Sequence, residues 1–354
     1  MGDKMSRHFK KVKNIFFYPK KETEEIVEKI NSFKGKDGFA IYNPECLGIM
    51  NSTKDLFENT VAMKEILNEK QANFIVDAII DANPKYVIFS SITFGWKNIV
   101  EKIKEKSDSI KVKFLWHGSH AMFVERDESY FLYGIMELMD RKLVDTVGFF
   151  KESMAKFYKA KGYNAFFVTN NVSKIKITNT ESFKKEKDKI YLGSYAAGDR
   201  WGKNTANQLS AASMIKNSVV DVIPTTNLIK EFCHTINLTI NDEKLGYLKR
   251  QELLNRMALN DVNLYVTFTE CSPVIPLESL ELGVPCITGN NHSYFKDSKL
   301  EEYLIVKSED DIDEIYEKIK VCLDKKQEII NLYKEWKKDY DILSNKLLDE
   351  FING

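Results

Sequence analysis

Two glutamates in the segment TECSPVIPLESLELGVP have the residue type and spacing to bind hydroxyl groups. Glu270 and Glu278 stand eight residues apart in this segment. Carboxylate oxygens accept hydrogen bonds from hydroxyls, and the backbone amides at 272–274 would form a helix N-terminus, which binds phosphate or sugar oxygens. A ligand that carries both hydroxyls and phosphates, such as a nucleotide-sugar, would suit these groups.

The elements around the two acids predict where they lie in a fold. The apolar run 262–266 predicts a buried strand, so Glu270 follows the carboxyl end of that strand. Ser272 could cap a helix and Pro273 suits its first position. Gly283 would end this helix before a further strand at 286–288. Ligands of open parallel sheets bind at the carboxyl ends of the strands.

The eight-residue interval alone is weak evidence for a binding site, because Glu301 and Glu309 have the same spacing in a charged stretch without such surroundings. A bare pair of this kind is typical of a solvated face. The preceding strand, the prolines and Gly283 distinguish the pair at 270 and 278.

The segment resembles the E-x7-E signature of retaining GT-B glycosyltransferases. The residues that match it as they stand are Glu270, Pro273, Glu278, Gly283 and Pro285, whereas Cys271, Ser272 and Glu281 depart from it. The resemblance implies that Glu270 contacts hydroxyls of the donor sugar near the reacting carbon and that Glu278 holds the ribose. It also places Ser272, Pro273 and Val274 among the donor-binding residues.

A second group of candidates lies near the start of the predicted second domain. Gly193 follows the first residues of a strand, and Arg200 and Lys203 precede a helix predicted at 205–215. A glycine-rich loop with two cations before a helix N-terminus can clamp a diphosphate. It is similar to the loop whose arginine and lysine hold the donor diphosphate in the same family.

The remaining candidates are single residues. His117 follows a predicted strand at 112–116 and would hydrogen-bond a sugar hydroxyl or balance charge; a histidine that only satisfies loop backbone is the alternative. Thr225 and Leu248 could line the nucleotide base, although both stand in ordinary loop sequence. The histidines and cysteines show no metal-binding spacing, so no metal and no cofactor are expected.

Composition limits the class of protein. The 354 residues contain 52 Lys+Arg and 52 Asp+Glu, and the resulting zero net charge argues against a dedicated nucleic-acid binder. The five cysteines form no C-x-x-C pair, which indicates reduced thiols in a cytoplasmic protein. No signal peptide or membrane-spanning run is recognised. The basic start, with Lys4, Arg7, Lys10, Lys11 and Lys13, could contact the inner membrane surface peripherally, but a solvated basic terminus is the better interpretation.

Strand-like and helix-like runs alternate along nearly the whole chain, starting with a strand at 14–18, which predicts an α/β protein with doubly wound sheets. The polar stretch 170–189 is the best linker candidate. We expect an N-terminal Rossmann-like acceptor-side domain at 1–172, a Rossmann-like nucleotide-sugar donor domain at 173–335, and a C-terminal helix at 336–354 that packs back on the first domain. Two such domains facing a cleft are the GT-B architecture of the family that the motif resembles.

The main hypothesis is a metal-independent glycosyltransferase. It would move a sugar from a nucleotide-diphosphate donor, by default a UDP-sugar, to a hydroxyl of a glycan or lipid-linked acceptor in surface polysaccharide or glycoconjugate biosynthesis. The resemblance implies retention of configuration at the transferred carbon. A nucleotide-sugar epimerase on the same fold and a non-catalytic nucleotide-sugar-binding partner of another transferase remain as alternatives.

Overall fold

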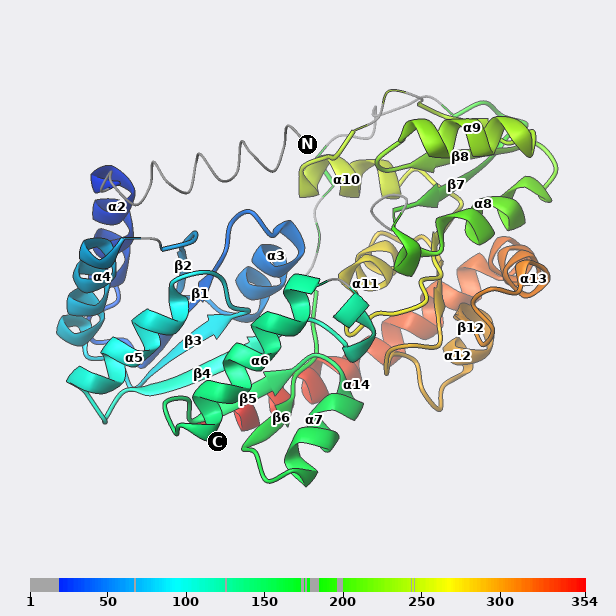
Figure 1. Cartoon of the computed structure of the whole chain (residues 1–354). Coiled ribbons are helices and arrows are strands. Elements are labelled where there is room, and N and C mark those ends of the chain that lie inside the picture. The colour runs from blue at the N-terminus through cyan, green and yellow to red at the C-terminus, as the bar shows by residue number, and fades with distance from the viewer. Residues whose placement is uncertain are drawn as a thin grey trace. The chain divides into compact units, whose positions relative to one another are not determined.

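The computed structural model describes residues 19–66, 68–124, 126–172, 175, 177–178, 185–195, 200–242, 244 and 246–354, with the side chains of 122, 124 and 126–128 excepted. The chain divides into two compact units, the first comprising residues 1–169 and 346–354 and the second residues 170–345 (Figure 1). The strand expected at 14–18 lies outside the described residues.

The first unit is built on a parallel six-stranded sheet in the order β2-β1-β3-β4-β5-β6. Its strands are β1 (Gly38–Tyr42), β2 (Thr60–Ala62), β3 (Tyr86–Ser90), β4 (Lys111–Trp116), β5 (Thr146–Phe149) and β6 (Ala165–Phe167). Its helices are α2 (Lys20–Asn31), α3 (Leu47–Leu56), α4 (Glu69–Ala82), α5 (Trp96–Lys106), η1 (His120–Val124), α6 (Arg126–Asp140) and α7 (Glu152–Ala160).

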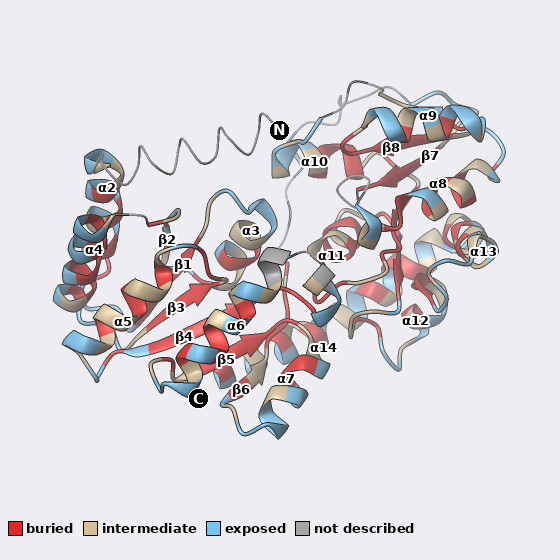
Figure 2. Cartoon of the chain, in the orientation of Figure 1, coloured by how far each residue is buried: buried red, intermediate tan, exposed pale blue. Residues whose placement is uncertain are grey.

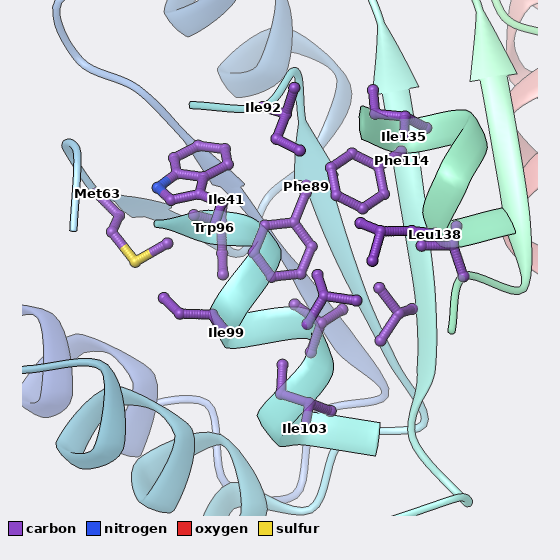
Figure 3. Packing of buried hydrophobic residues seen from close by; sticks show 14 of the residues in the cluster. Ile41, Met63, Phe89, Ile92, Trp96, Ile99, Ile103, Phe114, Ile135 and Leu138 are labelled. Carbon is purple, nitrogen blue, oxygen red and sulfur yellow. The ribbon is translucent and has the colours of Figure 1, made fainter. Parts of the chain in front are cut away.

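The core of the first unit lies between this sheet and its helices. Phe89 on β3 stacks on Phe114 of β4, with ring centroids 5.2 Å apart, and Trp96 of α5 lies 5.7 Å from Phe89 (Figure 3). The indole nitrogen of Trp96 donates to the Lys64 carbonyl at 3.0 Å, so this buried ring keeps its polar atom satisfied. Continuous apolar strands of this kind are typical of parallel sheets covered on both faces.

The second unit repeats the plan with the strand order β12-β11-β10-β7-β8-β9, again parallel throughout. Its strands are β7 (Ile190–Ser194), β8 (Ser218–Val222), β9 (Thr239–Ile240), β10 (Val262–Tyr265), β11 (Cys286–Gly289) and β12 (Ile305–Val306). Its helices are η2 (Trp201–Lys203), α8 (Thr205–Ser213), α9 (Asn227–Thr235), α10 (Arg250–Met257), α11 (Val274–Glu281), α12 (Lys299–Leu304), α13 (Ile312–Asp324) and α14 (Lys326–Asn353). The central strands of both sheets are buried (Figure 2), whereas the edge strands β2 and β9 are partly exposed.

Helix α14 contributes to both units, and the unit boundary falls within it at 345/346 instead of the predicted 335/336. The difference has a packing cause. Trp336 stacks on Tyr340 with centroids 4.4 Å apart, and the two rings contact Phe295 and Tyr294 of the second unit. The last turn belongs to the first unit, where the buried Lys113 donates to the Phe351 carbonyl at 3.2 Å. The other boundary lies at 169/170, against the predicted 172/173.

Some short elements of the two units have local causes. Helix α12 extends to Leu304, and only the two-residue strand β12 follows it. Leu300 and Leu304 are both buried at helical spacing, which explains the helix. The elements α3 and β2 were not anticipated, because α3 buries Ser52 and Thr53 and lacks an apolar stripe, while β2 has three residues.

Candidate functional site at the carboxyl edge of the second sheet

The loop after β10 carries Glu270, and the turn before α8 carries Lys203. Three backbone-directed bonds fix these two segments together. Asn204 donates from its side-chain amide to the Val266 carbonyl at 3.0 Å, and the Val266 amide donates to Gln208 Oε1 at 3.1 Å. The Phe268 amide donates to the Gly202 carbonyl at 3.0 Å. These bonds hold the backbone of the turn before α8 next to that of the loop after β10, and so they fix the positions of Lys203 and Glu270.

Lys203 and Glu270 form an ion pair. Lys203 Nζ lies 2.5 Å from Glu270 Oε1, and the two side chains are only 13% and 12% exposed. Tyr265, the last residue of β10, donates its hydroxyl to the same Oε1 at 2.8 Å. Burial raises the pKa of Tyr265 well above its usual value, and the neighbouring Glu270 carboxylate raises it further. The phenol therefore stays protonated and donates, so Oε1 is oriented from two sides.

Glu278 is paired with a different cation. It lies on α11 with 2% of its side chain exposed, and Arg250, the first residue of α10, donates from Nε to Glu278 Oε1 at 2.7 Å. The next residue along, Ser279, donates to the Val284 carbonyl at 2.7 Å and accepts from Asn263 Nδ2 at 2.8 Å. These bonds tie α11 to β10 and fix the helix that presents Glu278.

Helix α10 is held at its other end by a deeply buried ion pair. Arg256 donates from Nε to Asp221 Oδ2 at 2.8 Å and from a terminal nitrogen to Oδ1. Asp221 on β8 is fully buried, and its Oδ2 also accepts from the Tyr195 hydroxyl at 2.9 Å. A bidentate pair of this kind fixes direction as well as distance. It therefore sets the position of α10, and with it that of Arg250.

The first turn of α11 is built differently from the prediction. Ser272 does not cap the helix; Pro273 is the residue that precedes its first residue, Val274. The Ser272 hydroxyl instead accepts from the Asn170 amide at 2.8 Å and lies 2.7 Å from the Tyr294 hydroxyl. The serine is used to anchor the chain where the second unit begins, because its oxygen is drawn to these buried partners. Gly283 has a φ of 79°, which agrees with the predicted helix end.

The other predicted donor-binding residues have local structural roles. A Cβ at Gly193 would lie 2.2 Å from Asn263 Oδ1, so the buried side chains beside β7 require glycine there. The Thr225 hydroxyl donates to the carbonyls of Val222 at 2.9 Å and Asp242 at 3.1 Å. Leu248 packs partly buried against a small apolar cluster that includes Tyr195. Contacts of these three residues with a donor stay predictions.

Arg200 and Lys203 both lie near Tyr265, since Lys203 Nζ is 3.4 Å from its hydroxyl and the charge of Arg200 acts on the same phenol. Arg200 is exposed and lines an apolar pocket of about 320 Å³ with Trp201, Phe268 and residues of α8 and α9. The positive charge of Arg200 acts on the Tyr265 hydroxyl. Arg200 therefore lies on the same edge of the sheet as the Lys203–Glu270 pair. A shared diphosphate clamp stays a prediction.

His117 lies in the first unit, directly after β4. Its Nε2 is 2.8 Å from the Ser90 hydroxyl, and its ring lies 4.3 Å from that of Phe150. Burial lowers the pKa of His117 to about 3, so the imidazole is neutral at neutral pH. A neutral ring can exchange hydrogen bonds with hydroxyls but offers no charge. The alternative role of balancing charge is therefore not supported by this environment.

Sequence reasoning missed Arg250, Tyr265 and the buried pair of Asp221 and Arg256. One signal was available for Arg250, because a cation at the first position of a helix opposes the helix dipole. Such a residue needs an anionic partner. Tyr265 and Asp221 stand within apolar strands, where only the fold shows what they face. Among the described residues, no group of three or more His, Cys, Asp or Glu side chains could hold a metal ion.

Comparison with solved structures finds proteins with a similar fold. The trehalose-6-phosphate synthase OtsA matches with a TM-score of 0.59 at 10% identity, over 88% of this chain and 99% of that chain. A sucrose-phosphate synthase from Thermosynechococcus elongatus gives 0.56 at 12% identity, over 89% and 100%. A UDP-forming trehalose-phosphate synthase from Burkholderia xenovorans, in complex with glucose-6-phosphate, gives 0.59 at 9% identity, over 88% and 99%.

These neighbours are GT-B glycosyltransferases, and the chain has their α/β fold with two parallel sheets. At such low identity the likeness concerns the fold. No protein-family model matches the sequence, and no curated protein matches it in a sequence search. Within the part of the chain that the structure describes, no helix is long and apolar enough to cross a membrane.

Proposed function

We propose that this protein is a glycosyltransferase that transfers a sugar from a nucleotide-diphosphate donor, with a UDP-sugar as the first candidate, to an acceptor hydroxyl. The observation that carries the proposal is the pair of fixed acids at one sheet edge. Glu270 is oriented by Lys203 and Tyr265, and Glu278 is oriented by Arg250. Carboxylates held in this way accept hydrogen bonds from the hydroxyls of a sugar and a ribose.

The charges at this edge suit a nucleotide diphosphate. Three cations, Arg200, Lys203 and Arg250, accompany the two carboxylates Glu270 and Glu278. A diphosphate leaving group needs positive charge and backbone amides for its stabilisation. Lys203 would share its ammonium between Glu270 and the phosphates, and transfer would then proceed without a metal.

The names of the structural neighbours support the choice of donor and raise a candidate acceptor. A trehalose-6-phosphate structure from E. coli is described as bound with UDP-2-fluoro glucose, and the Burkholderia xenovorans synthase is described both as UDP-forming and as in complex with glucose-6-phosphate. We therefore place sugar phosphates beside glycan and lipid-linked hydroxyls as acceptors. Retention of configuration, which is named for a trehalose-6-phosphate synthase, is the expected stereochemical outcome.

A pocket in the first unit favours an anionic acceptor. This open pocket of about 970 Å³ is bounded by α2, β2 and the ends of β1 and α3. Five lysines and two glutamates line it: Lys20, Lys21, Lys29, Lys54, Lys64, Glu22 and Glu25. Two of these lysines pair with glutamates just outside the pocket, Lys20 with Glu24 and Lys64 with Glu45, which leaves a net charge of +1 (5 − 4). A concave surface with an excess of one sign of charge attracts a ligand of the opposite sign. A sugar phosphate would fit this surface better than a neutral sugar.

The test is product analysis by mass spectrometry. The purified protein is incubated with UDP-, GDP-, ADP- and TDP-sugars, each with a neutral sugar, a sugar phosphate or a lipid-linked acceptor. The proposal expects a glycosylated acceptor and free nucleoside diphosphate. Conversion of the donor to another nucleotide-sugar without an acceptor would identify an epimerase instead.

Two variants test whether the transfer activity depends on Glu270. Glu270→Gln should slow transfer roughly 10²-fold, whereas a change at Glu231, an exposed glutamate on α9, to Gln should leave transfer unchanged. Equal activity of both variants would refute the assigned site. Binding of a donor with no product from any acceptor would favour a non-catalytic binding protein.

A further inference from the structure

A chain of hydroxyls in the first unit leads to the imidazole of His117. Thr53 on α3 and Ser90 at the end of β3 are both fully buried. Their oxygens are 2.6 Å apart, and Ser90 Oγ lies 2.8 Å from His117 Nε2. All three residues belong to the first unit, so this arrangement is independent of the second unit.

The direction of the hydrogen bonds follows from counting protons. Thr53 Oγ1 lies 2.7 Å from the Ile49 carbonyl, which can only accept, so the single proton of Thr53 is directed to Ile49. Ser90 must therefore supply the proton between the two hydroxyls, because two oxygens at this distance without a proton would repel. With its only proton used, Ser90 accepts from His117, and the proton must lie on Nε2.

We propose that Thr53 and Ser90 are positioning residues that fix His117 as the Nε2–H tautomer and leave Nδ1 as a hydrogen-bond acceptor. Two further observations agree with this. Burial keeps the ring neutral, so it carries only one proton. The Phe150 ring, whose centroid lies 4.3 Å from that of the imidazole, restricts rotation of the imidazole about its Cβ–Cγ bond.

The tautomer specifies which chemical group His117 can bind. A ring nitrogen with a lone pair accepts a proton from a neutral donor such as a hydroxyl. It cannot donate to a phosphate or carboxylate oxygen. Nδ1 therefore needs a hydrogen-bond donor, and a hydroxyl is one such group; naming it as a hydroxyl of a transferred or accepting sugar rests on the proposed function, whereas the tautomer does not.

The tautomer is measured directly on the unliganded full-length protein by long-range ¹H–¹⁵N NMR with ¹⁵N-labelled histidine at neutral pH. The His117 signals are assigned by their loss in His117→Gln. The proposal expects a protonated, pyrrole-like Nε2 and an unprotonated, pyridine-like Nδ1. A wild-type spectrum with the proton on Nδ1 would overturn it, whatever the variants show.

The relay is tested by a pair of variants at one position. Thr53→Val removes the oxygen that takes the Ser90 proton, so Ser90 can turn and donate to Nε2, and the tautomer should shift toward Nδ1–H. Thr53→Ser keeps the hydroxyl and should keep the wild-type pattern. An unchanged pattern in a folded Thr53→Val protein, judged by its circular dichroism spectrum, would refute the role of Thr53. If that variant does not fold, Ser90→Ala replaces it, with loss of the tautomer preference expected.

Activity provides a separate readout. A shift of tautomer in Thr53→Val should lower kcat/KM for transfer by roughly tenfold, the worth of one hydrogen bond to a positioned group, while Thr53→Ser stays near wild type. If the tautomer is confirmed and no transfer is found with any donor, the proposed function fails and the positioning role stands. If transfer is found and the tautomer is wrong, the reverse holds.

Discussion

The two sheets of this protein have the same parallel construction but present different chemistry at their carboxyl edges. The edge of the first unit holds Ser90 and His117, which are uncharged and linked by a hydrogen bond. The edge of the second unit holds the Lys203–Glu270 and Arg250–Glu278 ion pairs. The uncharged residues of the first edge are suited to hydroxyls, whereas the ion pairs of the second edge, like the lysine-lined pocket of the first unit, are suited to phosphates as well.

This comparison shows that the parallel topology brings the carboxyl ends of the strands together at one edge. The residues just after the strands then determine which ligand groups that edge can bind. Both edges depend on buried partners behind them. In the first unit these are the hydroxyl of Thr53 and the Phe150 ring. In the second unit the buried Asp221–Arg256 pair holds the helix that carries Arg250. Substitutions of the buried partners should therefore mainly change stability, whereas substitutions on the edge itself should mainly change binding or transfer.

The largest effect is expected on the stability of the second unit, when the buried Asp221 is substituted. Asp221→Ala leaves the Arg256 guanidinium, only 9% exposed, without its carboxylate. Removal of one partner of a buried pair should lower the free energy of unfolding by about 3–5 kcal/mol. Urea unfolding measures this loss. The control is Asp242→Ala, whose carboxylate is 41% exposed and 4.0 Å from Arg256; an equal loss in both variants would contradict the structural role of Asp221.

Next in size is the effect of Glu270→Gln on transfer. The amide lacks the charge that pairs with Lys203, so the sugar and the leaving group lose their alignment, and kcat should fall roughly 10²-fold. The unfolding free energy should change less than in Asp221→Ala. Steady-state kinetics and urea unfolding on the same preparation test both statements. A fall in stability with unchanged kcat would assign Glu270 to the fold instead of the site.

A smaller effect is expected for Arg250→Ala. Glu278 would lose the guanidinium that orients it at 2.7 Å, and the Kd for the nucleotide-sugar should rise roughly tenfold. Arg250→Lys keeps the charge without the Nε donor and should give an intermediate Kd. Isothermal titration calorimetry measures both. Tighter binding in Arg250→Ala would mean that the arginine competes with the ligand for Glu278.

A further effect concerns the neutral edge and the pH dependence of stability. The pKa of His117 is lowered by burial to about 3 in the folded protein, whereas the unfolded chain has a value of about 6.5. Below pH 6.5 the unfolded state binds a proton that the folded state does not, so the contribution of His117 to stability is present above pH 6.5 and declines toward pH 3. His117→Gln should show a shallower loss of urea stability between pH 7 and pH 5 than wild type. Identical slopes would contradict the lowered pKa.

The fold and part of the charged edge could be predicted from the sequence. The alternation of strands and helices predicted two doubly wound sheets, since the helical period and the apolar strands are local signals. Glu270 and Lys203 were both proposed from loop positions after strands, and the structure brings them together. The partner of Glu278 was not predicted, because Arg250 meets it only through the packing of α10 against α11.

The hydroxyl chain behind His117 was beyond sequence reasoning for a similar reason. Thr53 and Ser90 are 37 positions apart and meet because α3 packs at the end of β1 beside β3. The short α3 carries no apolar stripe that would have revealed it. Ser272 was misassigned because a serine before a proline suits a helix cap locally, whereas buried partners at Asn170 and Tyr294 compete for its oxygen.

The most direct test of the central claim is calorimetric binding of UDP-glucose and related nucleotide-sugars to the wild-type protein and to Glu278→Gln. The account predicts saturable binding to the wild type and a Kd raised at least roughly tenfold in the variant, with an unchanged circular dichroism spectrum. Equal binding to both proteins, or no binding of any nucleotide-sugar to the wild type, would contradict it.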